Sequence, residues 1–118
     1  EFAKIYEYMH HLGNRYKYHC YLVMVTMETN PDHIMYIENI EDALDCMEQA
    51  IRQKIRKVDI CTHYSSMQYL IILYETDETK IPQIMNRIFI EYYKLYSKHH
   101  LEPTYEYIPI MKNKAPNI

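Results

Sequence analysis

The feature that most constrains the fold is the stretch from Arg56 to Leu73, where two strand-like segments follow each other across a short polar turn. The stretch consists of a helix end with an Arg-x-x-Asp pattern, a short strand, a tight turn, and an apolar strand from Tyr69 to Tyr74. Two strands joined by so short a turn form a β-hairpin. A helix that leads directly into a hairpin indicates a fold that combines helices with a mostly antiparallel sheet.

Two further segments have the pattern of strands. Residues 20–27 are almost continuously apolar and rich in residues that favour strands. Such a run predicts a strand that is buried on both faces and lies centrally in the sheet. Residues 103–111 alternate enough in hydropathy to predict a final strand.

Helical periodicity separates these strands. Apolar residues recur every three or four positions over residues 2–12, over residues 40–55, and again in a long helix that opens at Asp77. Residues 34–37 predict one or two further helical turns. The resulting order of helix, strand, short helix, helix, strand, strand, helix and strand predicts an α/β fold. Its expected type is an α+β two-layer sandwich, ferredoxin-like, with helices packed on a mostly antiparallel sheet.

Composition limits the organisation and the partners of the chain. The 118 residues, 48% of them apolar or aromatic, fit one domain over residues 1–118. The net charge of −3 comes from interspersed acidic and basic residues, so we expect no nucleic-acid partner and no direct membrane contact. No apolar run approaches the roughly 20 residues that span a bilayer. Because the chain begins at Glu1 without a methionine, we expect a fragment of a larger protein.

Cysteines and histidines do not have the spacing of metal ligands. Cys20, Cys46 and Cys61 each lie in an apolar-patterned segment, which predicts buried free thiols and suits the cytoplasm. Two ligands on one helical face need a spacing of about four residues, whereas the histidines at 10–11 and at 99–100 are adjacent. We therefore expect no metal site and no cofactor.

The hairpin residues carry a resemblance. Arg56 and Asp59 precede Tyr64 and the apolar strand 69–73 at a fixed distance. This layout resembles the GGDEF domain of bacterial diguanylate cyclases, which has a nucleotide-cyclase-like fold. Its members commonly carry Arg-x-x-Asp, then Arg-Tyr-Gly-Gly-(Asp/Glu)-Glu-Phe and an apolar strand. Here the arginine is replaced by His63, the two glycines by Ser65 and Ser66, the metal-binding acid by Met67, the glutamate by Gln68 and the phenylalanine by Tyr69.

The rest of the chain matches the family in architecture more than in residues. The usual Asn-Asp-x-x-Gly-His-x-x-Gly-Asp stretch is not visible, and the C-terminal Ala-Lys-x-x-Gly pattern is absent. The resemblance thus implies a degenerate, shortened member. Its expected role is a regulatory or interaction module of a bacterial signalling protein, with other domains of that protein or a separate protein as partner. Tyr92, Tyr93 and Tyr96 on the last helix form either a homodimer surface or a core edge.

The replaced residues argue against diguanylate cyclase activity. In the family, two metal ions hold the triphosphate, and hard cations of that kind need carboxylate oxygens. One carboxylate position falls at about Thr26, and the other falls at Met67, whose thioether is a weak ligand for magnesium. Ser65 and Ser66 add Cβ atoms where the nucleotide must approach the backbone. Residual GTP-dependent activity would have to use Glu28 and an unidentified second carboxylate.

Arg56 and Asp59 are the candidate ligand-binding residues. In the family, such a pair forms an inhibitory site for cyclic di-GMP, in which the guanidinium grips phosphate and guanine edges. Arg52, one turn earlier, would add a second cation on the same face. The alternative is that Arg56 caps its helix and forms an exposed ion pair with Asp59 that contributes little.

Overall fold

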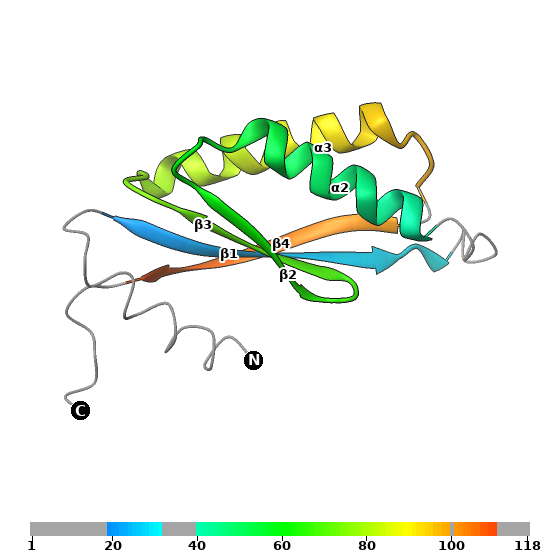
Figure 1. The fold of residues 1–118 in the computed structure, drawn as a ribbon, viewed down its shortest axis with the longest axis horizontal. Helices are drawn as coiled ribbons and strands as arrows, with labels where there is room; N and C mark the ends of the chain where they lie inside the picture. The colour runs from blue at the N-terminus through cyan, green and yellow to red at the C-terminus, as the bar shows by residue number, and fades with distance from the viewer. Residues whose placement is uncertain (1–18, 32–39, 100, 111–118) are drawn as a thin grey trace.

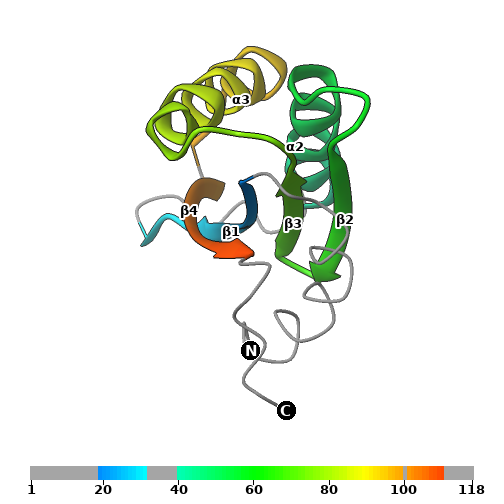
Figure 2. The same cartoon turned by 90° about the vertical axis from the view of Figure 1, so that its left-hand side faces the viewer.

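A computed structural model describes residues 19–31, 40–99 and 101–110, which form one antiparallel four-stranded sheet and two α-helices. The strand order in the sheet is β2-β3-β1-β4. Both helices cover the same face of the sheet (Figures 1 and 2). In chain order the elements are β1 (Cys20–Thr29), α2 (Ile40–Lys54), β2 (Ile60–Ser65), β3 (Gln68–Leu73), the short 3₁₀ helix η2 (Glu78–Lys80), α3 (Ile81–Leu95) and β4 (Leu101–Ile110).

This topology is ferredoxin-like. The strands β1 and β2 are joined through α2, and β3 lies between them and runs antiparallel to both. The last strand, β4, returns through α3 to the other side of β1. The predicted two-layer α+β sandwich with a hairpin after the second helix is confirmed.

Strand β1 is the centre of the sheet. It pairs with β3 from Tyr21 opposite Leu73 to Thr26 opposite Gln68, and it pairs with β4 along its whole length. Successive side chains of a strand point to opposite faces. Val23 therefore belongs to the core under the helices, whereas the next residue, Met24, belongs to a second buried cluster. The prediction of a central strand buried on both faces is confirmed.

The helices bury the stripes that their periodicity predicts. The buried residues of α2 are Ala43, Met47, Ala50 and Ile51, and those of α3 are Ile81, Met85, Ile88 and Tyr92. The expected helix that opens at Asp77 begins as the short 3₁₀ turn η2, and Asp77 caps this turn by accepting a hydrogen bond from the Thr79 N–H at 3.0 Å. Pro82 lies in the first turn of α3, where a missing N–H costs little.

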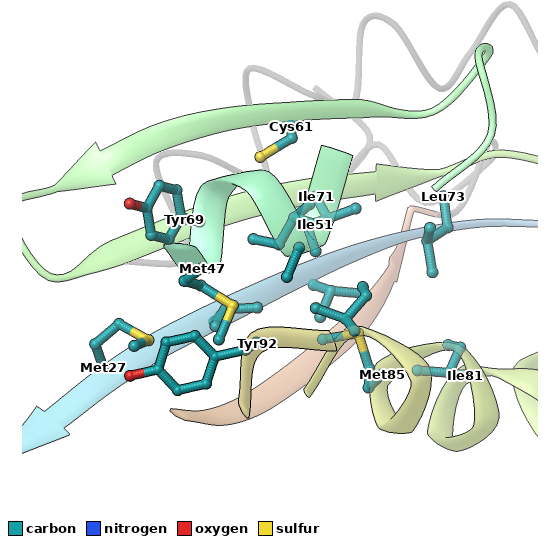
Figure 3. Close-up of a cluster of buried hydrophobic side chains, with 14 of the residues drawn as sticks. Met27, Met47, Ile51, Cys61, Tyr69, Ile71, Leu73, Ile81, Met85 and Tyr92 are labelled. Carbon is teal, nitrogen blue, oxygen red and sulfur yellow. The ribbon is translucent and has the colours of Figure 1, made fainter. Parts of the chain in front are cut away.

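Two tyrosine rings are buried in the core, and their hydroxyls form hydrogen bonds. Figure 3 shows Tyr69 and Tyr92 among the buried methionines and aliphatic residues. The Tyr69 hydroxyl donates to the Leu44 carbonyl at 2.8 Å, and the Tyr92 hydroxyl donates to the Leu101 carbonyl at 2.8 Å. Burial raises the pKa of both phenols far above the usual range. Of the two readings given for the helix tyrosines, core packing holds for Tyr92 and for Tyr96, which is 9% exposed.

Strand β4, at one edge of the described sheet, contains two prolines. Pro103 lies opposite Met27, and Pro109 lies opposite Tyr21. The Met27 N–H donates to the Met67 carbonyl at 2.8 Å, on the hairpin side, so it points away from β4. Opposite residues of an antiparallel pair exchange both ladder bonds or neither. The Pro103 nitrogen therefore faces away from β1, and so does that of Pro109, six residues along.

Some predictions concern residues that lie outside the described ranges, namely the helix at 2–12 and the short helical turns at 34–37. The final strand begins two residues earlier than predicted, at Leu101. Within the described residues, no helix is both long and apolar enough to cross a membrane.

Candidate functional site

The hairpin turn and the end of β1 form the region where the family resemblance locates metal chemistry. Ser66 and Met67 make the two-residue turn between β2 and β3. Its Met67 carbonyl accepts from Met27 N–H, and Thr26 of β1 is the direct partner of Gln68. The structure thus brings Thr26 close to the substituted turn, although Thr26 and Met67 are 41 residues apart in the sequence.

Neutral side chains occupy this meeting point and bind one another. The Ser65 hydroxyl donates to Gln68 Oε1 at 2.8 Å, and Gln68 Nε2 donates to Thr26 Oγ1 at 3.2 Å. The same Nε2 lies 3.2 Å from the Met24 sulfur. These groups offer hydroxyl, amide and thioether atoms, whereas Mg²⁺ sites use carboxylate and phosphate oxygens.

Glu28 lies two residues beyond Thr26 of this network and has a carboxylate neighbour. Glu28 Oε2 accepts from the Thr104 hydroxyl at 3.3 Å, and Glu102 of β4 lies directly opposite Glu28 in the ladder. Glu102 is thus a carboxylate that the ladder places beside Glu28. Glu102 Oε2 also lies 3.5 Å from His99 Nδ1. Among the described residues, no group of three or more His, Cys, Asp or Glu side chains is arranged to hold a metal ion.

The remaining residues of the signature turn are held by their neighbours in the fold. The His63 ring packs against Tyr69 in a tilted arrangement with ring centroids 4.5 Å apart, and its Nε2 lies 3.9 Å from Glu48 Oε1 on α2. Tyr64 is half-buried and packs against the second buried cluster, on the face opposite the helices. A bulge between His63 and Ser65 shifts the register just before the turn.

Arg56 and Asp59 form a clamp between the end of α2 and the end of β3. The Asp59 side chain is 2% exposed and accepts four hydrogen bonds. Its Oδ2 accepts from the backbone N–H and Nε of Arg56 at 2.9 and 3.1 Å, and its Oδ1 accepts from Arg56 Nη2 and the Tyr74 N–H, both at 3.1 Å. The reading of this pair as exposed is therefore wrong for Asp59, although the Arg56 side chain is 53% exposed.

The same clamp holds the loop after β3. Arg56 Nη2 donates to the Tyr74 carbonyl and, at 3.1 Å, to Thr76 Oγ1. The Thr76 hydroxyl also donates to the Tyr74 carbonyl at 2.9 Å. Between these two residues, the exposed Glu75 adopts a left-handed conformation with φ of 47°. A carboxylate has about four acceptor positions, so Asp59 has none left for a ligand, whereas the Arg56 guanidinium is partly exposed.

A hollow of about 470 Å³ opens beside Arg56, between the end of α2 and the start of α3, and we call it the helix-side hollow. Four basic side chains line it, from Lys54, Arg56, Lys80 and Arg87. Sequence reasoning missed Lys80 and Arg87, because no spacing along the chain shows that the start of α3 lies against the end of α2. Its acidic lining residues are Asp59, Glu75 and Asp77.

Arg52 lies elsewhere. Its Nε donates to Glu48 Oε2 at 3.0 Å, and its Nη2 donates to the Cys61 carbonyl at 3.4 Å on strand β2. Arg52 does not belong to the described lining of the helix-side hollow. These contacts place Arg52 over β2, an edge strand of the described sheet.

Comparison with solved structures supports the fold. The chain superposes on a DGC (diguanylate cyclase) protein from Thermotoga maritima with a TM-score of 0.64 and 16% identity, covering 92% of this chain and 76% of that one. It also superposes on the diguanylate cyclase SiaD from Pseudomonas aeruginosa, in complex with its activator SiaC, with a TM-score of 0.65 and 12% identity. That match covers 90% of this chain but only 44% of SiaD.

At these identities the comparison establishes the diguanylate cyclase-like fold. No protein-family profile matches the sequence. A search of the curated proteins also found no match.

Proposed function

We propose that this chain is a GGDEF-like module that does not synthesise cyclic di-GMP and instead serves a bacterial signalling protein as a regulatory or interaction domain. The proposal rests on the diguanylate cyclase-like fold together with the neutral network at the hairpin turn. The free thiols Cys20, Cys46 and Cys61 are compatible with a cytoplasmic setting.

The network of Ser65, Gln68 and Thr26 is the observation that carries the proposal. At the place where the family resemblance calls for acidic residues, hydroxyl and amide groups satisfy each other at 2.8 and 3.2 Å. A two-metal clamp neutralises the charge that develops on the phosphates, and neutral groups do not hold such a clamp. Ser65 and Ser66 also place Cβ atoms along the turn, where a nucleotide would need close backbone approach.

Incubation with GTP and either Mg²⁺ or Mn²⁺, followed by chromatography of the nucleotides, tests the loss of catalysis. We expect no dinucleotide product. Formation of cyclic di-GMP that is abolished by Glu28→Gln or Glu102→Gln, but kept by Glu106→Gln, would overturn the proposal. Glu106 is the matched control because it lies on the same strand, opposite the neutral Met24.

A second candidate function is a receptor for cyclic di-GMP, and the helix-side hollow favours it. The hollow combines the partly exposed Arg56 with Lys54, Lys80 and Arg87. Guanidinium groups bind phosphate oxygens through two parallel hydrogen bonds. Because Asp59 is fully engaged in the clamp, this candidate relies on the cations of the hollow and not on the Arg-x-x-Asp pair acting as a unit.

Calorimetry with cyclic di-GMP separates the two candidates. Arg87→Ala is the informative variant, because Arg87 lines the hollow without taking part in the clamp. Arg52→Ala removes the same charge outside the hollow and serves as its matched control. A heat of binding that is lost in Arg87→Ala and retained in Arg52→Ala supports the receptor function. The absence of any heat of binding at high micromolar cyclic di-GMP argues against it.

A protein partner fits the proposed role. SiaD was solved in complex with its activator, which illustrates that a diguanylate cyclase can receive a protein regulator. By analogy we infer a protein partner, or another domain of the same protein, for this chain. Co-purification of the chain from a bacterial host at low salt, with charge-reversed variants as controls, tests this inference.

A further inference from the structure

A second hollow of about 470 Å³ lies on the other side of the loop after β3, and we call it the acidic hollow. It shares the residues 75–77 with the helix-side hollow. Its described lining consists of His19, Tyr21, Glu75, Thr76, Asp77, Glu78 and Thr79. Three acidic residues thus line a space whose volume lies within the range of about 300–1,000 Å³ that is typical of ligand pockets.

Two of these carboxylates are held in place. The Tyr107 hydroxyl donates to Glu78 Oε2 at 2.8 Å, and Asp77 Oδ1 accepts from the Thr79 N–H at 3.0 Å. The hydrogen bonds from Thr79 lower the pKa of Asp77, so this carboxyl is ionised at neutral pH.

An independent feature of the hollow is the hydroxyl of Tyr21. Tyr21 is 6% exposed, and its ring packs edge-on against Tyr107 with centroids 5.9 Å apart. Within residues 19–31, 40–99 and 101–110, its hydroxyl has no hydrogen-bond partner, although Tyr21 lines the hollow. Burial, and then the charges of Glu78 and Asp77, raise the pKa of this phenol, so it stays protonated. A buried hydroxyl is normally satisfied by a hydrogen-bond partner, and a ligand in the hollow would supply one here.

The acceptors and the ring define the chemistry of a ligand. Carboxylates and a phenol oxygen accept hydrogen bonds from a cation, and a tyrosine ring attracts one to its face. A bare divalent ion fits poorly, because the hollow is much wider than an ion and the described residues contain no cluster of three metal ligands. An alkylammonium or guanidinium group carries several N–H donors on an apolar stem. The donors match the carboxylate and phenol oxygens, and the positive charge matches the tyrosine ring.

We propose that the acidic hollow binds an organic cation, namely the guanidinium or ammonium group of a partner protein's arginine or lysine, or that of a free polyamine. The site is separate from the hairpin turn. It shares residues 75–77 with the helix-side hollow but uses none of the four basic side chains there, so this proposal stands independently of the proposed function.

Titration of the ¹⁵N-labelled chain with n-butylguanidinium chloride, at constant ionic strength, tests the site by NMR. We expect saturable shifts of the backbone amides of Thr76, Asp77, Glu78 and Thr79. Tyr21→Phe keeps the ring and should weaken binding about two- to tenfold, as expected for one hydrogen bond. Glu78→Gln should weaken binding by at least as much. Circular dichroism verifies that both variants are folded.

Asp45→Asn is the matched control, because it removes one exposed negative charge from α2, outside the hollow. The proposal is overturned if butylguanidinium shifts none of these amides, if Asp45→Asn weakens binding as much as Glu78→Gln, or if MgCl₂ at equal concentration shifts the same amides more strongly. Parallel titrations with spermidine and with a blocked Arg-Gly-Arg peptide identify the source. Tighter binding of the peptide assigns the site to a protein partner, and tighter binding of spermidine assigns it to a polyamine.

Discussion

The backbone N–H of Tyr74 donates to Oδ1 of Asp59 at 3.1 Å, so a buried carboxylate at the start of β2 fixes the end of β3. Arg56 completes this arrangement from the end of α2 through Nε and Nη2. Three segments of the fold therefore depend on one Arg-x-x-Asp pattern. The pattern has a structural role in this chain whether or not a nucleotide binds beside it.

Arg56→Ala should destabilise the protein, because it removes two charged hydrogen bonds from a buried carboxylate. Asp59 keeps the backbone N–H groups of Arg56 and Tyr74 as donors, so we expect a loss of about 1.5–3 kcal/mol. Urea unfolding followed by circular dichroism measures it. The control is Arg52→Ala, whose exposed ion pair with Glu48 predicts a change below about 1 kcal/mol. Equal effects of the two variants would contradict the clamp.

Tyr92→Phe should also destabilise the fold, because it leaves the Leu101 carbonyl without its hydroxyl donor. Tyr92 is fully buried, and an unsatisfied buried acceptor costs about 1–3 kcal/mol. The free energy of unfolding is again the quantity to measure. Tyr93→Phe is the matched control, since Tyr93 is only half-buried and stacks on His99 through its ring. A loss in the control as large as that in Tyr92→Phe would contradict this account.

The buried thiol of Cys61 predicts a fall in stability at alkaline pH. Burial raises its pKa from 9.0 to about 11, so the folded state retains a proton that the unfolded state loses. The contribution is fully present below pH 9 and is lost as the pH rises toward 11, with a slope of at most about 1.4 kcal/mol per pH unit. Unfolding of the wild type and of Cys61→Ala from pH 8 to 10.5 measures the difference. An equal slope in both proteins would refute the assignment to Cys61.

Glu28→Gln should stabilise the protein, because Glu28 and Glu102 are directly opposite each other across β1 and β4. Like charges at such a pair are destabilising, and the gain should be about 0.2–1 kcal/mol at low salt. It should shrink in 1 M NaCl, where charges are screened within about 3 Å. Glu106→Gln is the control, and a gain of the same size there would point to net charge alone as the cause.

The helix and strand periodicity predicted the sheet, its central strand and the hairpin, because buried stripes repeat at the spacing of each element. The candidate site was less predictable. Arg56 and Asp59 were found by their distance from the hairpin, but the pattern does not reveal that Tyr74 and Thr76 complete their hydrogen bonds. Lys80, Arg87 and Glu102 were missed. Each of them lies near the other residues of its site only because separate helices or strands pack side by side in the fold.

Arg52 illustrates how the end of a helix limits such predictions. Its spacing of four residues from Arg56 suggested a shared face, but α2 ends at Lys54. Arg56 therefore lies outside the regular helix, and helical spacing no longer relates the two side chains. Sequence patterns locate the end of a helix only to within a few residues. Here the exact end of α2 determined whether helical spacing relates Arg52 to Arg56.

Pro103 and Pro109 have a consequence for the behaviour of the protein in concentrated solution. An exposed edge strand is a template on which further chains can add by backbone hydrogen bonding, the first step toward fibrils. Because both prolines place their nitrogens on the side of β4 away from β1, two positions on that side have no N–H to donate. On β2, at the opposite edge of the described sheet, the Cys61 carbonyl is occupied by Arg52. These features reduce the number of backbone groups that a further strand could use to pair with the sheet.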